Sequence, residues 1–207
     1  MNAEKVLSSI NLIVEKYAPN ASKAPEFEAL AQSLREEIAL AEQKKAGRSD
    51  RFKAALRFSK VANKANLGRR FGLAGAYVMD GKQYIVHDHL AVCFDTPMDG
   101  LVEAGKGERF TSFDKVIEPR YKSVELPSMA DVKTQAKLAK AEGNLDKHGI
   151  HRVEIDGVQF NSKLLIQIME MVGDGEAYLC NNSNFSPLVL IGNGARGVVL
   201  PMRKEVA

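Results

Sequence analysis

The alternation of hydrophobic and polar positions is clearest in residues 153–203. A strand-like run and an Asp156-Gly157 turn come first. A predicted helix follows, which Asn161 or Ser162 can cap and Gly173 can end. Its apolar residues recur at helical spacing: Phe160, Leu164, Leu165, Ile168, Met171 and Val172. Three strand-like runs follow, separated by segments rich in turn-forming residues: 176–180, 187–191 and 197–202. The pattern predicts a strand, a helix and then three strands.

Residues 1–48 are predicted to form a helical extension ahead of a main domain that spans residues 49–207. One apolar stripe at helical spacing consists of Val6, Leu7, Ile10, Ile13, Val14 and Tyr17. After a break at 19–22, a second stripe, which Pro25 can begin, consists of Phe27, Leu30, Ala31, Leu34, Ile38 and Ala41. Two amphipathic helices with a short connection predict an antiparallel hairpin. Its apolar face must be buried against the main domain or against another subunit.

The middle of the chain also reads as a helix followed by strands. Residues 51–66 form the predicted helix, with an inner face of Phe52, Ala55, Leu56, Ser59 and Ala62. Strand-like runs at 71–78 and 83–94 follow, with Asp80-Gly81 as a hairpin turn. A further strand at 124–127 precedes a helix that Ser128 caps and that ends before Gly143. A strand-helix-strands unit is therefore predicted around 51–97 and again around 121–203, in an α+β fold.

Basic residues recur along one side of two predicted helices. They stand at i, i+4, i+7 and i+11 on the 51–66 helix and at i, i+4 and i+7 on the helix after Ser128, so each set projects from a single face. One interpretation is a solvated face. The other is a surface that contacts the phosphates of duplex DNA, formed by Lys53, Arg57, Lys60, Lys64, Lys133, Lys137 and Lys140.

The overall composition is that of an ordinary globular protein. The chain has 207 residues, of which 45% are hydrophobic and 27% charged, with a net charge of +3. No apolar run approaches the roughly 20 residues of a membrane span, and the first residues lack the order of a signal peptide. Cys93 and Cys180 stand in apolar runs and are expected to be buried free thiols. We therefore expect a cytoplasmic protein that does not bind membranes.

The motifs of common enzyme classes are not found in the sequence. There is no phosphate-binding Gly-Lys-Ser loop, no nucleophile elbow and no pair of carboxylates in an apolar context. His87 and His89 alternate along a strand-like run and could face the same way. A third metal ligand at a convincing spacing is not visible in the sequence. We expect neither catalysis nor a metal or other cofactor.

Several short motifs resemble, in their order and spacing, those of the bacterial DNA polymerase III beta subunit, the sliding clamp. In the last third they are Phe160-Asn161, Leu164-Leu165, Ser186-Pro187-Leu188 and the closing Val198-Val199-Leu200-Pro201-Met202-Arg203. In the middle they are the helix at 55–63, Leu73-Ala74-Gly75, Leu90-Ala91-Val92-Cys93 and, more loosely, 110–119. One turn departs from the family pattern: clamps usually read Asp-Gly-His-Arg where this chain has Val86-His87-Asp88-His89. The alternative is an unrelated α+β domain that ends in a strand.

The resemblance implies a DNA-clamp-like domain of two helix-plus-antiparallel-sheet halves. It implies a replication accessory protein, or processivity factor, whose helices contact the backbone of duplex DNA without reading its sequence. It also implies that replication or repair proteins dock a short peptide motif in a pocket that would contain Leu90, Val198, Val199, Leu200, Pro201, Met202 and Arg203. A bacterial clamp has three such domains per chain, so this chain would need a higher homo-oligomer to form a ring. The alternative is a clamp-fold peptide-binding adaptor or regulator that does not encircle DNA.

The closing strand carries a further signal. Alternation places Val199 and Pro201 on one face, and Leu200 and Met202 on the other. Because proline has no N–H to donate, this end of the strand suits a sheet edge or an exit from the sheet. We expect one face to pack on the 160–172 helix and the other, with Met202, to line a partner pocket.

Overall fold

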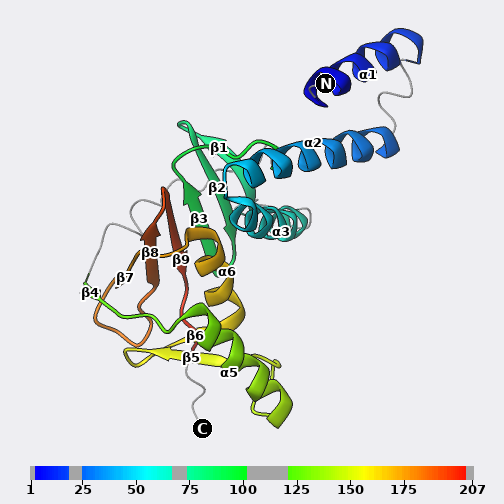
Figure 1. The fold of residues 1–207 in the computed structure, drawn as a ribbon. Helices are drawn as coiled ribbons and strands as arrows, with labels where there is room; N and C mark the ends of the chain where they lie inside the picture. Colours follow the sequence, from blue (N-terminus) through cyan, green and yellow to red (C-terminus); the bar gives the residue numbers. More distant parts are fainter. Residues whose placement is uncertain (1–2, 19–24, 67–73, 102–120, 204–207) are drawn as a thin grey trace.

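The computed structural model describes residues 3–18, 25–66, 74–101 and 121–203. Its helices are α1 (Ala3–Tyr17), α2 (Pro25–Lys45), α3 (Ser49–Asn66), α5 (Met129–Glu142) and α6 (Ser162–Val172) (Figure 1). Its strands are β1 (Gly75–Met79), β2 (Lys82–His87), β3 (Leu90–Phe94), β4 (Lys122–Ser123), β5 (Arg152–Ile155), β6 (Val158–Asn161), β7 (Glu176–Leu179), β8 (Leu188–Gly192) and β9 (Ala195–Val199). Among these residues, no helix has both the length and the hydrophobicity to cross a lipid bilayer.

An antiparallel sheet in the order β1-β2-β3-β9-β8-β7-β4 forms the centre of the α+β fold. Helix α3 is followed by the meander β1-β2-β3, and α6 is followed by the meander β7-β8-β9. The two meanders join where β3 pairs with β9, with Leu90 opposite Val199 and Phe94 opposite Ala195. A separate hairpin, β5-β6, leads directly into α6 (Figure 1).

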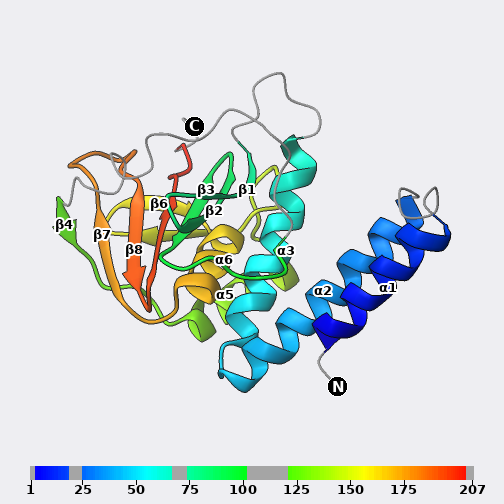
Figure 2. The same ribbon diagram turned by 90° about the horizontal axis from the view of Figure 1, so that it is seen from above.

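The main apolar core lies between the sheet and the helices α3 and α6 (Figure 2). Phe52 of α3 and Ile168 of α6 are fully buried in it. Gly197 in β9 allows α6 to lie close to the sheet, since a Cβ there would come within 2.6 Å of Ile168 Cδ1. The other face of the sheet also carries a buried apolar cluster, formed by Tyr84, Val86, Ala91, Cys93, Cys180, Val189 and Val198. The central strands are therefore buried on both faces.

Most of the predicted turn and cap residues have the predicted roles. Three hairpins close on two residues with positive φ, the conformation that Asp-Gly and Asn-Gly favour: Asp80-Gly81, Asp156-Gly157 and Asn193-Gly194. Ser128 Oγ accepts a hydrogen bond from the Asp131 N–H at 3.1 Å, and Asn161 Oδ1 accepts one from the Lys163 N–H at 2.9 Å. Each is therefore the N-cap of its helix, α5 or α6. Gly143 and Gly173 follow the last residues of these helices, as predicted.

The predicted strand at 124–127 is wrong. Only Lys122 and Ser123 pair with β7 as the strand β4. One more hydrogen bond follows, from the Val124 N–H to the Ala177 carbonyl oxygen at 3.0 Å. The chain leaves β7 after Val124 and turns at Pro127 into the Ser128 cap of α5. The run at 83–94 is divided into β2 and β3 by a turn at residues 88–89. The loosely matched segment 110–119 lies outside the described residues.

The closing strand β9 is central, because it pairs with β3 on one side and β8 on the other. A position at the sheet edge is therefore wrong, and the alternative of an exit from the sheet is correct. A central strand needs donors on both sides, and Pro201 cannot supply one. The strand accordingly ends at Val199, before the proline.

Helix α2 is joined to the main domain through the core. Ala39 of α2 is buried in the same cluster as Phe52 of α3. Helix α1 lies beside α2, with its first turns next to the C-terminal half of α2 (Figure 2). There Leu7 and Asn11 border a small cavity together with Ile38. Helix α2 thus contacts α1 on one side and the main domain on another.

Candidate functional site

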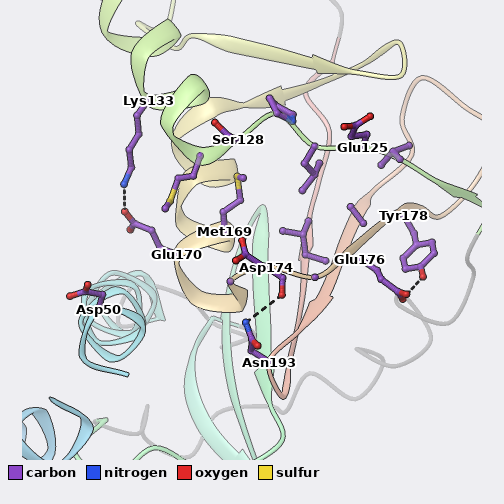
Figure 3. A pocket seen from close by; sticks show the side chains of 18 of the residues that line it. Asp50, Glu125, Ser128, Lys133, Met169, Glu170, Asp174, Glu176, Tyr178 and Asn193 are labelled. Atoms are coloured by element: carbon purple, nitrogen blue, oxygen red, sulfur yellow. Dashed lines mark hydrogen bonds and ion pairs between the residues drawn. The ribbon is translucent and has the colours of Figure 1, made fainter. Parts of the chain in front are cut away.

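The two predicted basic stripes belong to one layer of helices. Helix α6 packs against both α3 and α5, and lies between them (Figures 1 and 3). Most of the predicted residues are exposed, and Lys133 of α5 is half-buried. The structure thus places Lys53, Arg57, Lys60 and Lys64 on one side of α6 and Lys133, Lys137 and Lys140 on the other.

A single carboxylate on α6 joins the two stripes. Glu170 Oε2 lies 2.9 Å from Arg57 Nη2, and Glu170 Oε1 lies 2.8 Å from Lys133 Nζ (Figure 3). The Glu170 side chain is 22% exposed, whereas those of Arg57 and Lys133 are 70% and 43% exposed. The shared carboxylate ties α3, α5 and α6 together and neutralises part of the basic surface. No pattern in the sequence indicates this contact, because Arg57 and Glu170 are far apart along the chain.

The remaining cations differ in their partners. Lys60 Nζ lies 2.7 Å from Glu36 Oε2 of α2, so the extension also contributes an acid to this surface. Lys53 Nζ lies 3.5 Å from Asp50 Oδ1 within α3. Three exposed residues form no ion pair with any other described residue, and they are Lys64, Lys137 and Lys140. These three are the cations most available to an external anion.

A pocket of about 1020 Å³ lies beside these ion pairs (Figure 3). Its apolar lining comes from the segment after β4 and from α5, α6, β7 and β8, and includes Val124, Leu126, Met129, Met169, Ala177 and Leu190. Lys53, Arg57 and Lys133 line the side nearest α3 and α5. Glu125 and Glu176 stand on the side away from them (Figure 3). Sequence reasoning missed this pocket, since residues from six helices and strands that are far apart in the sequence form it.

Asn193 and Arg51 fix the end of α6 next to the pocket. Asn193 Nδ2 donates to the Asp174 carbonyl oxygen at 3.3 Å (Figure 3). Arg51 Nη1 donates to the Asn193 carbonyl oxygen at 2.6 Å, and its guanidinium carbon lies 5.0 Å from the centroid of the Phe94 ring. Burial lowers the pKa of Arg51, and the charge of Arg48 lowers this pKa further. An arginine stays charged in a protein, so Arg51 serves as a structural cation between α3 and the β8-β9 turn.

The predicted peptide pocket divides into buried and accessible residues. The buried ones stand in the central strands β3 and β9, where none is more than 5% exposed, and are Leu90, Val198 and Val199. The accessible ones follow β9 and are Leu200, Pro201, Met202 and Arg203, of which Leu200 is 38% exposed. Peptide binding stays a prediction, and only residues 200–203 offer it an accessible surface.

Backbone hydrogen bonds hold this terminal segment against two hairpins. The Leu200 N–H donates to the His89 carbonyl oxygen at 2.9 Å, in the β2-β3 turn. The Met202 N–H donates to the Gln159 carbonyl oxygen of β6 at 2.7 Å. Residues 200–202 therefore do not continue the predicted strand. Their backbone instead contacts two different hairpins.

Arg152 connects the terminal segment to the loop before β5. Its Nη1 donates to the Arg203 carbonyl oxygen at 3.2 Å, and its Nη2 lies 3.0 Å from Asp146 Oδ2. Burial acts to raise the pKa of Asp146, but hydrogen bonds from the Ile150 N–H, the Arg152 guanidinium and the His148 N–H outweigh it, and the pKa lies below its usual value. The ionised carboxylate thus holds Arg152 in position to bind the terminal segment.

The cysteines are in surroundings that make thiols unreactive. Cys93 and Cys180 are buried and free, as predicted. Burial raises the pKa of both thiols, so they are protonated near neutral pH.

His87 lies next to Phe58, with ring centroids 6.2 Å apart. Within the described ranges, no three His, Cys, Asp or Glu side chains gather in a way that could hold a metal ion.

No family model matches the sequence, and no curated protein matches it. Among solved structures, the chain is similar to the beta clamp of Helicobacter pylori in its crystal structure bound to a DNA ligase peptide, with 14% identity and a TM-score of 0.35. The matched region covers 59% of this chain and 41% of that clamp chain. The chain therefore spans less than half of that clamp, and an overlap at this level gives no residue-by-residue correspondence.

Proposed function

We propose that this chain is a clamp-like accessory protein whose helical layer contacts the backbone of duplex DNA. The observation that carries the proposal is the convergence of two basic stripes, from α3 and α5, on the two sides of α6. Phosphates are equivalent at every base pair, so cations that meet only phosphates permit binding at any sequence. The sequence motifs that resemble sliding clamps, and the repeated order of a helix and three strands, agree with this role.

The ion pairs of the layer set the order in which cations become available. Lys64, Lys137 and Lys140 are exposed and can meet phosphates directly. Arg57 and Lys133 are held by Glu170, so a phosphate must compete with that carboxylate for them. Because Lys and Arg side chains are long and flexible, this exchange requires no movement of the helices. We therefore infer moderate, strongly salt-dependent binding.

A salt titration of binding to fluorescent duplexes tests this proposal. The triple variant Lys64→Glu, Lys137→Glu and Lys140→Glu should weaken binding to all duplex sequences alike. Each lost contact should lower the slope of log affinity against log salt by about 0.9. The control changes the same charge elsewhere, on β2, β4 and the loop before β5: Lys82→Glu, Lys122→Glu and Lys147→Glu. Because Lys122 Nζ lies 2.7 Å from Asp156 Oδ2, the melting temperature of this control is measured alongside its DNA binding. Equal losses in both triple variants, or binding restricted to one sequence, would refute contact through this layer.

A second candidate function is a clamp-fold adaptor that docks partner peptides and does not encircle DNA. The observation that favours it is the exposed Leu200, held just beyond a central strand by the backbone of His89. An apolar side chain fixed in this way offers a preformed contact for an extended peptide. The residues involved would be Leu200, Pro201, Met202 and Arg203.

Calorimetry with the DNA ligase peptide of the Helicobacter pylori complex tests the adaptor. The double variant Pro201→Ala and Met202→Ala should lose peptide affinity while its melting temperature changes little, since both residues follow the last strand. Val199→Ala is the control for core damage, because Val199 is fully buried. Retained affinity together with a large fall in melting temperature would show that residues 200–203 serve the core alone.

A further inference from the structure

Helix α1 and the first half of α2 expose several large apolar side chains. Ile13 is 58% exposed, Tyr17 74% and Leu30 62%, and Ile10 and Leu12 are exposed as well. The main domain, by contrast, buries most of its large apolar residues between sheet and helices. Apolar groups gathered on one surface of a soluble protein commonly mark an interaction site.

Most of these side chains share one side of the α1–α2 pair. On α1, Ile10, Ile13 and Tyr17 stand at i, i+3 and i+7 and form one stripe, beside the flank that Leu7 and Asn11 turn toward α2. On α2, an equivalent stripe is formed by the exposed Leu30 and the half-buried Leu34, at i and i+4. With about 100° between successive residues and the two helices running in opposite directions (Figure 2), both stripes point to the same side. We call Ile10, Ile13, Tyr17, Leu30 and Leu34 the apolar face.

Leu12 stands on a different flank of α1. It is 67% exposed, as much as any member of the apolar face except Tyr17. Its direction differs from that of Ile13 by about 100°, and from that of Tyr17 by more. Leu12 therefore provides a control residue of the same size, exposure and helix.

We propose that the apolar face pairs two copies of this chain about a twofold axis, with α2 antiparallel to α2 of the partner. The charge distribution of α2 supports this occupant. Its first turn carries Glu26 and Glu28, and its last turn carries Lys44 and Lys45. Antiparallel pairing of α2 along its whole length, beyond the apolar face, sets the acidic first turn of each copy beside the basic last turn of the other. A twofold interface requires this self-complementarity.

The size of the face sets the strength of the pairing. Two helices about 10 Å wide, side by side over the roughly 22 Å of α1, present about 450 Å², below the roughly 800 Å² per partner of a standard stable interface. An interface of this size fits a weak, reversible dimer. A short helix such as α1 is marginal by itself and gains stability from packing, so dimer formation and the order of α1 are coupled. This pairing is independent of the proposed contact with DNA.

Sedimentation velocity across the micromolar range tests the pairing. The wild-type chain should pass from monomer to dimer. The double variant Ile13→Gln and Tyr17→Gln should raise the dissociation constant roughly 100-fold, about tenfold for each substituted position, since each position contributes one side chain from each copy. Leu12→Gln should leave it unchanged. A wild-type chain that stays monomeric, or a Leu12→Gln variant as weak as the double variant, would overturn the proposal.

A charge swap tests the antiparallel arrangement and the identity of the partner. The variant Glu26→Lys and Glu28→Lys has two basic ends, and the variant Lys44→Glu and Lys45→Glu has two acidic ends. Each alone should dimerise less than the wild type, and an equal mixture should form a heterodimer, because both ends then carry opposite charges. Circular dichroism checks that each variant keeps the helix content of the wild type. No gain on mixing, with helices retained, would exclude this arrangement.

Discussion

Removing the shared carboxylate of Glu170 should reduce stability and strengthen DNA binding at the same time. Glu170 accepts from Arg57 at 2.9 Å and from Lys133 at 2.8 Å, and its side chain is largely buried between α3 and α5. Glu170→Gln keeps the shape and one acceptor oxygen but removes the charge. The amide also presents its NH₂ group to one of the two cations. Both cations would then be more available to phosphates.

The two effects have different sizes. Exposed ion pairs contribute about 0.2–1 kcal/mol each, and both cations here are substantially exposed. The expected loss is therefore about 1 kcal/mol in the free energy of unfolding, or about 2–4 °C in melting temperature for a domain of this size. On the binding side, two added phosphate contacts should steepen the slope of log affinity against log salt by roughly 1.8.

Chemical denaturation and salt-dependent anisotropy, measured on the same preparations, check both expectations. Glu154→Gln is the matched control, because Glu154 is an exposed glutamate on β5 that makes the same change in net charge. The reasoning fails if Glu170→Gln destabilises the fold and leaves the salt slope at the wild-type value. Arg57 and Lys133 would then be structural residues that do not meet DNA.

Three further outcomes follow from packing and burial. Gly197→Ala should cost about 1–3 kcal/mol of stability by overpacking against Ile168, and adding Ile168→Val should recover part of it; wild-type melting in the single variant would contradict the close approach of α6. The lowered pKa of Asp146 means that its stabilising effect is complete above its unfolded-state pKa of about 3.9 and is lost as pH falls through the folded-state pKa. Asp146→Asn should therefore show a shallower loss of stability in acid denaturation, and an acid profile identical to the wild type would count against this. Cys93 and Cys180, whose burial raises their pKa, should react with a thiol reagent only at the rate of unfolding, and fast labelling in native buffer would be the contrary result.

The local elements of the fold were predictable from the sequence because their signals are local. An Asp-Gly or Asn-Gly pair has few alternatives to a tight turn, and Ser128 and Asn161 cap their helices through residues two or three positions away. The 124–127 segment shows the limit of this reasoning. Its apolar residues suit a strand, but whether a strand forms depends on how far β7 can pair, and that pairing ends at Val124.

The candidate site was only partly predictable, because its chemistry depends on contacts between distant residues. The spacing of the basic residues identified the stripes on α3 and α5. It could not show that Glu36 and Glu170, on other helices, neutralise some of them. Likewise, the apolar pattern of Val198 and Val199 is equally typical of a pocket and of a core strand. The pairing of β9 with both β3 and β8 places these residues in the core.

The pairing of β3 with β9 has a consequence for synthesis on the ribosome. Residues 90–94 bind residues 195–199, so everything between must be translated before the central ladder can form. During that interval the first meander has its β3 side unpaired, and such an edge can accept strands from neighbouring nascent chains. Contacts this distant in sequence also form slowly. Yield from a cell should therefore depend on translation speed and chaperone supply more than the stability of the finished fold alone would suggest.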